Sequence, residues 1–212
     1  DFESGACTDP ASVALHAMLK SDLKVGESFA VLGVGPIGLF AIQWAKIMGA
    51  EKIFAIDILD EKLDVARQLG ASYAVNAKNT DPVKFLLEET KGKGVQSVVE
   101  FAGSKVTQEQ SVRIAAKEGT VVFGGISYED LLIPSSTLDA LLRKEIRIVG
   151  AWNSVFSPLP ANEWKISLHF MAEGSLRCAP IISHRFSLDE APEVFQRIWN
   201  KSGFFNKVLF IP

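Results

Sequence analysis

Residues 28–38, SFAVLGVGPIG, decide the fold of this chain. Ser28 to Leu32 is a short apolar run of strand-forming residues, and a glycine cluster follows it directly. The cluster reads G-x-G-x-x-G, and apolar residues at helical spacing come after it. A strand before the motif and a helix after it are the context in which it binds a dinucleotide. Gly33 allows the tight turn, Gly35 lets the backbone approach a pyrophosphate, and Gly38 lets the helix pack on the strand.

The helix after the motif is expected over Ile37 to Met48, with Gly49 at its C-terminal cap. Its first turn has free backbone N–H groups, which together with the helix dipole favour a phosphate at this end. Pro36 and Ile37 therefore join the glycines as expected contacts of the cofactor. A plain glycine-rich turn is the alternative, and a second signal further along the chain argues against it.

Asp57 is that second signal, because it ends the next strand, Lys52 to Asp57, nineteen residues after Gly38. A carboxylate there accepts hydrogen bonds from the ribose hydroxyls of adenosine and repels a 2′-phosphate, so the sequence predicts NAD(H) rather than NADP(H). Lys62 is expected to reach the same ribose. The alternatives are an ordinary strand-end acid and a solvated helix lysine; helix capping is assigned to Asp60.

Two further glycine turns follow later strands, at Gly103 and at Gly124-Gly125. Ligands of doubly wound sheets lie across the carboxyl ends of the strands. Ala102, Gly124 and Ile126 are therefore expected to line the nicotinamide. Tight turns alone explain these glycines equally well, so both interpretations stay open.

Strands and helices alternate up to about residue 153, and the strands are continuously apolar, as is typical of a parallel sheet covered on both faces. The pattern predicts an α/β fold with a doubly wound, six-stranded parallel Rossmann sheet. We expect a linker or helix over 1–16, an NAD-binding domain over 17–153, and an α+β tail over 154–212 that returns to a catalytic domain. The other expected strands are Tyr73–Asn76, Val95–Phe101, Gly119–Gly124 and Glu145–Gly150, and the other expected helices are Asp60–Leu69, Pro82–Thr90, Val106–Lys117 and Ser135–Leu142.

The tail differs from the preceding units. Ser157 to Pro160 is a breaker segment, and Glu163 to Glu173 has the pattern of one helix. A strand over Arg185–Leu188, a helix over Asp189–Asn200 and a last strand over Lys207–Ile211 are expected after it. These elements do not form another strand–helix–strand unit.

Composition excludes several classes of function. The chain is 48% hydrophobic, has a formal net charge of -3 and shows no basic patch, so nucleic acid is not an expected partner. No segment is long and apolar enough for a membrane span, and with no visible signal peptide the default location is the cytoplasm. Cys7 and Cys178 form no CxxC pair, which favours packing roles for both.

Several segments resemble the zinc-dependent medium-chain alcohol and sorbitol dehydrogenases, a family whose catalytic domain is GroES-like, and the resemblance covers essentially the whole chain. They include Ala6–Ala17, Asp57–Lys62, Leu69–Ala71, Val99–Gly103 and Lys207–Pro212. Within the family, three segments are most similar to galactitol-1-phosphate 5-dehydrogenases. These are Gly150–Asn153, Ser157–Pro160 and Glu163–Trp164. The first residues read like the middle of a protein, so we expect the coenzyme-domain portion of a longer enzyme.

The resemblance implies a reaction and a metal. A catalytic zinc polarises the alcohol oxygen of a polyol, sugar alcohol or sugar-alcohol phosphate, and a hydride moves to NAD. Most zinc ligands of the family come from the domain that is absent here. Asp9 falls where the sorbitol dehydrogenase branch has a Glu and is one methylene shorter. Three outcomes stay open for it: direct zinc binding, action through a water molecule, or no zinc binding, and the structural alternative is a helix N-cap ahead of Pro10. His16, His169 and His184 lack metal-ligand spacing and are expected to be structural.

Two other functions stay open. A non-catalytic NAD(H)-binding module or redox sensor fits the departure at Asp9. A methyltransferase also uses a glycine-rich loop, but the full motif and the six-strand plan argue against it. The resemblance also implies a homodimer or homotetramer, for which Leu131 to Pro134 and the sixth strand would supply an exposed sheet edge. The alternative for Leu131 to Ile133 is a buried connector.

Overall fold

The structure, a computed structural model, describes residues 1–155 and 162–211. The breaker segment Ser157–Pro160 lies outside them. The strands are β1 Ser28–Leu32, β2 Lys52–Asp57, β3 Tyr73–Asn76, β4 Val95–Glu100, β5 Ala115–Phe123, β6 Arg147–Gly150, β7 Ile182–Ser187 and β8 Lys207–Ile211. The helices are α1 Phe2–Lys20, α2 Pro36–Ile47, α3 Asp60–Leu69, α4 Pro82–Glu89, α5 Lys105–Ile114, α6 Ser135–Lys144, α7 Glu163–Ala172, the short 3₁₀ helix η1 Leu188–Glu190 and α8 Ala191–Trp199. None of them is both long and apolar enough to cross a membrane.

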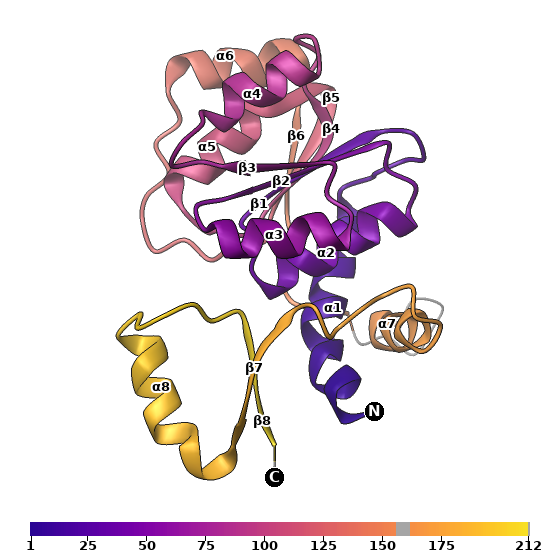
Figure 1. Ribbon diagram of the computed structural model, residues 1–212. Coiled ribbons are helices and arrows are strands. Elements are labelled where there is room, and N and C mark those ends of the chain that lie inside the picture. Colours follow the sequence, from indigo (N-terminus) through magenta and orange to yellow (C-terminus); the bar gives the residue numbers. More distant parts are fainter. Residues whose placement is uncertain (156–161, 212) are drawn as a thin grey trace.

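A six-stranded parallel sheet forms the centre of the molecule, in the order β3-β2-β1-β4-β5-β6 (Figure 1). The predicted doubly wound sheet is therefore confirmed. The direction of winding reverses between β1 and β4, and such a switch point is where ligands enter sheets of this kind. The glycine loop follows β1 at this position.

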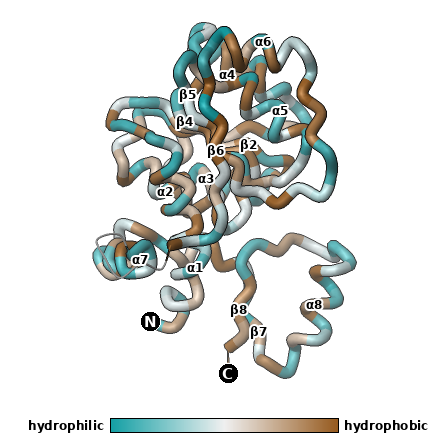
Figure 2. The backbone as a smooth tube through the Cα atoms, turned by 180° about the vertical axis from the view of Figure 1, so that it is seen from behind, coloured by the Kyte–Doolittle hydropathy of each residue, from teal (hydrophilic) through white to brown (hydrophobic). Residues whose placement is uncertain are grey.

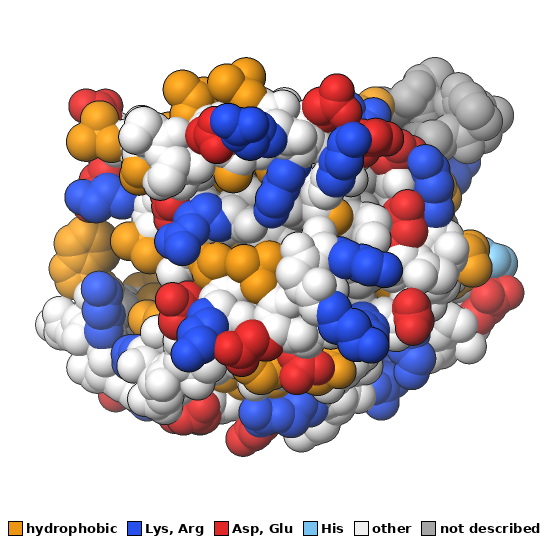
Figure 3. Space-filling view, turned by 90° about the horizontal axis from the view of Figure 1, so that it is seen from above, with side chains coloured by type: hydrophobic (Ala, Val, Ile, Leu, Met, Phe, Trp, Pro, Cys, Tyr) orange, Lys and Arg blue, Asp and Glu red, His pale blue; other side chains and the backbone are white. Residues whose placement is uncertain are grey.

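Helices cover both faces of the sheet. α2 and α3 lie on one face with α1 behind them, while α4, α5 and α6 lie on the other (Figure 1). Each face has its own buried apolar cluster, which is why the strands are apolar on both sides. On the molecular face seen from above, side chains of both charge signs are interspersed (Figure 3).

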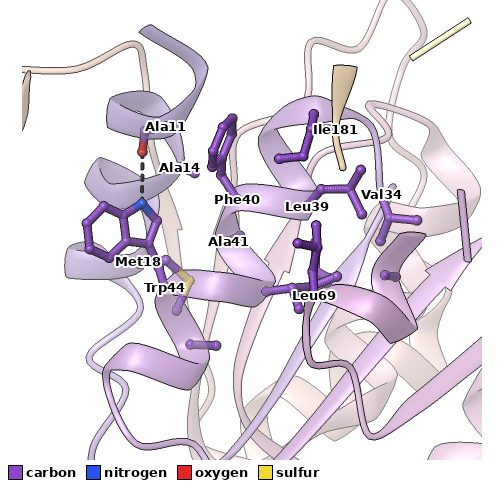
Figure 4. Packing of buried hydrophobic residues seen from close by; sticks show 14 of the residues in the cluster. Ala11, Ala14, Met18, Val34, Leu39, Phe40, Ala41, Trp44, Leu69 and Ile181 are labelled. Atoms are coloured by element: carbon purple, nitrogen blue, oxygen red, sulfur yellow. Dashed lines mark hydrogen bonds between the residues drawn. The ribbon is translucent and has the colours of Figure 1, made fainter. Parts of the chain in front are cut away.

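The α1 side of the sheet is packed most extensively, because α1 packs against α2 and α7. The Trp44 indole Nε1 donates to the Ala11 carbonyl over 3.0 Å (Figure 4). The Trp44 ring also meets Phe170 edge-on. Ile181, just before β7, joins the same cluster (Figure 4). The tail is therefore rooted in the core of the nucleotide domain, and the boundary expected between residues 16 and 17 falls inside α1.

Most helix ends agree with the sequence. Asp81 caps α4 by accepting from two backbone N–H groups, and Gly70 ends α3 in the left-handed conformation. The expected capping role of Asp60 is wrong. Leu59 occupies the N-cap of α3 without a side-chain hydrogen bond, and the Asp60 carboxylate accepts from Asn76 Nδ2 at 2.9 Å instead.

The helix expected over Val106–Lys117 ends three residues early, at Ile114, and β5 begins at Ala115 rather than at Gly119. Ala115 pairs with Val95, and the register then shifts before the pairing of Ser97 with Thr120. Local helix propensity is thus overridden by pairing with β4 across a bulge.

The tail forms a second, two-stranded parallel sheet of β7 and β8. β7 begins at Ile182, earlier than expected, because its first residues pack into the core. The helix expected from Asp189 is divided into η1 and α8, and Val194 is the buried residue of α8. Figure 2 shows α8 and this sheet standing beside the main body. α7 begins at Glu163 as expected.

Candidate functional site

The glycine loop between β1 and α2 is held by contacts that no other residue type permits. Gly33 has φ +92, donates to the Ile56 carbonyl over 2.8 Å, and would bring a Cβ within 2.6 Å of the Ala102 nitrogen. A Cβ on Gly38 would lie 2.2 Å from the Gly33 carbonyl oxygen. These two glycines are therefore required by packing within the protein itself.

Gly35 differs from the other two glycines, because apart from its chain neighbours no described residue lies within 4 Å of where its Cβ would be. Its φ of -66 and ψ of -173 suit any residue. It is the N-cap of α2, where Pro36 follows, and it has no side-chain cap, so the helix N-terminus is open to an incoming group. The space above Gly35 is what a pyrophosphate needs for close approach to the backbone.

Asp57 lies beside this loop, as predicted. Its Oδ2 accepts from the Val34 N–H at 2.9 Å, and its Oδ1 accepts from the N–H groups of Ile58 at 2.7 Å and Leu59 at 3.1 Å. Lys62 Nζ is 3.9 Å from Oδ2. The carboxylate thus ties the end of β2 to the glycine loop, and Lys62 lies next to it.

The turns after β4 and β5 pack against each other at the carboxyl edge of the sheet. A Cβ on Gly103 would lie 2.2 Å from the Ile126 carbonyl oxygen, and one on Gly125 would lie 2.4 Å from the Gly103 nitrogen. Gly124 is limited by the Phe101 ring, 2.6 Å from its Cβ position. Ala102, which meets Gly33, connects these turns to the glycine loop. The structure therefore brings Ala102, Gly124 and Ile126 to the same edge as Gly33.

Glu100, the last residue of β4, is a candidate functional residue that sequence reasoning missed. It is fully buried, and its Oε1 accepts from the Gly103 N–H and the Thr107 hydroxyl, each at 2.8 Å. Burial raises the pKa of this carboxyl, while the Thr107 hydroxyl and the backbone N–H groups of Gly103 and Ala102 oppose that shift. The available signal was an acidic residue closing an otherwise apolar strand.

The described residues do not supply a zinc site. Asp9 is an exposed residue within α1, and the helix is capped by Asp1, so the interpretation of Asp9 as an N-cap is wrong. No cluster of three or more His, Cys, Asp or Glu side chains suited to a metal occurs in 1–155 or 162–211. The donor set of a catalytic zinc is thus incomplete within the described chain.

The histidines and cysteines have other partners. His16 Nδ1 is 2.8 Å from Glu163 Oε1, His169 Nε2 is 3.3 Å from Glu173, and His184 contacts Ser183. Cys7 and Cys178 are both free thiols buried in the same apolar cluster. Contact with Cys178 lowers the pKa of Cys7, and contact with Cys7 raises that of Cys178, so the fold brings together two thiols that sequence spacing had left apart.

These features define a class: a doubly wound α/β protein with a glycine-rich loop at its switch point, the arrangement typical of nucleotide-binding sheets. Comparison with known proteins identifies the family within this class. The family model for zinc-binding dehydrogenases matches residues 36–173, so the chain belongs to the zinc-binding dehydrogenase family. Its residues correspond to the C-terminal portion of that family's members.

Individual relatives agree. Galactitol 1-phosphate 5-dehydrogenase of Escherichia coli is 33% identical over all of this chain, and sorbitol dehydrogenase of Gallus gallus is 30% identical over 92% of it. The crystal structure of galactitol-1-phosphate dehydrogenase from Escherichia coli superposes with a TM-score of 0.91 at 32% identity, covering 100% of this chain and 61% of that one. A structure described as a zinc-binding dehydrogenase of Sinorhizobium meliloti bound to NADP gives 0.87 at 31% identity, covering 99% of this chain and 59% of that one.

This chain spans 61% of the length of the galactitol 1-phosphate enzyme and 53% of the sorbitol dehydrogenase. Both names describe oxidoreductases that act on small polyols or their phosphates, and the predicted resemblance to this family is confirmed.

Proposed function

We propose that this chain is the NAD(H)-binding portion of a zinc-dependent oxidoreductase that transfers a hydride from a polyol, sugar alcohol or sugar-alcohol phosphate to NAD. One observation carries the proposal: the vacant space at Gly35 opens onto an uncapped helix N-terminus beside the carboxylate of Asp57. When bound, NAD supplies the hydride acceptor. The residues of this chain hold its phosphates at Gly33, Gly35, Pro36, Ile37 and Gly38.

The preference for NAD(H) over NADP(H) rests on Asp57. Its carboxylate retains acceptor capacity on Oδ2 for a ribose hydroxyl, and its charge opposes a 2′-phosphate. Lys62, at 3.9 Å from the carboxylate, is directed to the same ribose. One related structure is bound to NADP, so the preference of this chain for NAD(H) has to be measured directly.

The nicotinamide is assigned to the edge formed by Ala102, Gly124 and Ile126. Their backbones are packed tightly at the carboxyl ends of β4 and β5, beside the switch point. The turns would orient the nicotinamide ring toward the substrate side. The polyol or sugar-alcohol phosphate class is suggested by the names of the relatives.

The zinc ligands are assigned mainly to a catalytic domain beyond these residues, with Asp9 as the contribution of this chain. Two observations support this. The described residues lack a metal-ligand cluster, and the β7–β8 sheet among them has two strands. Parallel sheets are normally covered on both faces, and two strands alone are marginal in water. A further domain that packs on β7, β8 and α8 would cover them. The division into 1–16, 17–153 and 154–212 belongs to this proposal, as does a cytoplasmic location.

The test is a titration of the purified chain with NADH and NADPH, followed by energy transfer from tryptophan to the nicotinamide. We expect NADH to bind at least about tenfold more tightly than NADPH, because the Asp57 carboxylate repels the 2′-phosphate. Equal affinities would contradict the cofactor preference, and binding of neither nucleotide would contradict the site.

A dehydrogenase assay separates binding from catalysis. We expect this chain alone to show no zinc-dependent polyol oxidation, since it offers Asp9 where at least three ligands are needed. Turnover that depends on added zinc would overturn the division of roles. A non-catalytic NAD(H)-binding module is the second candidate, favoured by the same lack of a described ligand cluster. The full-length protein decides between the two, because only the first candidate predicts zinc-dependent polyol oxidation by it.

A further inference from the structure

Glu100 occupies a position that the sheet would fill with an apolar side chain. Its register partners are Leu32 on β1 and Phe123 on β5, and the two residues before it are the fully buried Val98 and Val99. Its second carboxylate oxygen, Oε2, is buried and has no hydrogen-bond partner among the described residues. A buried polar atom left unpaired costs free energy, so packing alone does not explain a carboxyl here.

The Glu100 carboxyl holds the turn after β4, which is one of the two turns to which the nicotinamide is assigned. Oε1 accepts the Gly103 N–H at 2.8 Å, and Gly103 has φ +66, a conformation that glycine adopts without strain. The Thr107 hydroxyl, also 2.8 Å from Oε1, holds the carboxyl from the first turn of α5. Glu100 therefore joins the end of β4 to the start of α5.

The same residue holds the second turn through its backbone. The Glu100 carbonyl oxygen accepts from the N–H groups of Gly124 and Gly125, each at 2.9 Å. The two turns are also interlocked, since the Cβ position of Gly125 lies 2.4 Å from the Gly103 nitrogen. A shift of Gly103 must therefore move the turn after β5 as well.

We propose that Glu100 is a positioning residue for the nicotinamide half of the cofactor, acting through Gly103 and the turn at Gly124-Gly125. The inference rests on the proposed function, because it assigns the nicotinamide to these turns. The adenosine half lies elsewhere, at Asp57 on the far side of the glycine loop. Places where a sequence breaks the ordinary rules of a buried strand are where functional constraints are expected.

Separation of the two halves gives the test. ADP-ribose carries the adenosine and the pyrophosphate but no nicotinamide, so it reports on the Gly33–Asp57 side of the site. NADH engages both sides. The dissociation constants of both ligands are measured for the wild-type chain and for E100L, E100Q and T107V, together with thermal unfolding.

In E100L the acceptor for the Gly103 N–H and the Thr107 hydroxyl is lost while the volume is kept. We expect the NADH dissociation constant to rise about tenfold and that of ADP-ribose to change by less than about twofold. E100Q keeps an acceptor oxygen, so it should retain most of the NADH affinity. T107V frees the carboxyl from α5 and should raise the NADH constant about threefold.

T137V is the matched control, because Thr137 makes the same kind of contact, a hydroxyl 2.6 Å from the Glu109 carboxylate, away from these turns. T137V should leave the dissociation constants of both NADH and ADP-ribose unchanged. The positioning role would be overturned if E100L or T107V lost affinity equally for NADH and ADP-ribose. It would also be overturned if both variants bound NADH as tightly as the wild type. If E100L does not fold, T107V against T137V decides the question. Failure of the wild type to bind either ligand would instead contradict the proposed function.

Discussion

The Asp57 carboxylate supports the backbone before any cofactor binds. It accepts from Val34 in the glycine loop and from Ile58 and Leu59 at the start of α3. A hydrogen bond to a charged acceptor contributes about 1.5–3 kcal/mol, which is more than a neutral one contributes. Asp57 thus holds the glycine loop in shape and is also proposed to bind the cofactor. A change at this position should therefore affect both the stability of the fold and the affinity for the cofactor.

Asp57→Ala tests that coupling. We expect the free energy of unfolding to fall by about 1–3 kcal/mol, because the Val34 N–H loses its acceptor. NADH should bind at least about tenfold more weakly, and NADPH should lose less because the repulsive charge is gone. Denaturant unfolding and nucleotide titration measure these changes. The control is Asp64→Ala, which removes an exposed carboxylate of α3 paired with Arg67 and should alter neither stability nor nucleotide affinity. Unchanged stability in Asp57→Ala would contradict the structural role of Asp57.

The residues of the site divide into those that local sequence predicts and those that it does not. Gly33 and Asp57 are found because a motif and a spacing mark them. Glu100 is missed because its significance depends on Gly103, Thr107 and the β5 turn, which only the folded sheet brings to it. The expected role of Asp60 fails for the same reason, since its partner Asn76 comes from a neighbouring strand end.

At the scale of elements, the β1–loop–α2 unit contains two glycines with different physical roles. Gly38 is fixed by the Gly33 carbonyl, whereas Gly35 has an ordinary backbone conformation and free space beside it. The first is needed for the loop to form. The second is needed only if something else is to occupy that space.

Gly35→Ala and Gly38→Ala therefore give opposite patterns. Gly35→Ala should leave stability within about 1 kcal/mol of wild type, because its backbone suits alanine, yet weaken NADH binding by at least about tenfold. Gly38→Ala should lower both stability and affinity, since its Cβ would lie 2.2 Å from a carbonyl oxygen. Thermal unfolding and NADH titration of both variants check this. Full NADH affinity in a folded Gly35→Ala would exclude a pyrophosphate there.

Element types were predictable because strands and helices alternate with distinct hydrophobic periods. Their ends were less so. α5 stops at Ile114 because Ala115 is drawn into pairing with Val95, and β7 begins at Ile182 because that residue packs in the core. In both cases the deciding contact comes from residues distant in sequence, which a local pattern does not contain.

At the scale of the whole molecule, β6 lies at the edge of the sheet, as predicted, and Ile148 on it is exposed. Leu132 and Ile133 are also exposed, which contradicts the alternative of a buried connector. An open strand edge beside apolar side chains favours pairing with another chain. This agrees with the homodimer or homotetramer that the family resemblance implies, and we propose that two copies join at β6.

Leu132→Glu tests that assembly. Leu132 is 82% exposed, so the change should not affect folding, but a charge placed in an apolar interface should weaken dimerisation by at least about tenfold. Sedimentation velocity over a range of concentrations measures it. Trp199→Glu, at a comparably exposed position (87%) at the end of α8, is the control. A wild-type chain that stays monomeric at high concentration would contradict the proposed dimer in this chain.

The shared core beneath α2 has a consequence for how such proteins diversify. Leu176, Ile181 and Leu209, from the tail, pack in one cluster with α1 and α2. A gene segment that encoded residues 17–153 alone would yield a nucleotide fold with an uncovered apolar flank. Recombination that transferred only the segment encoding residues 17–153 would therefore not transfer a complete folding unit. The segments that flank it must be inherited together with it.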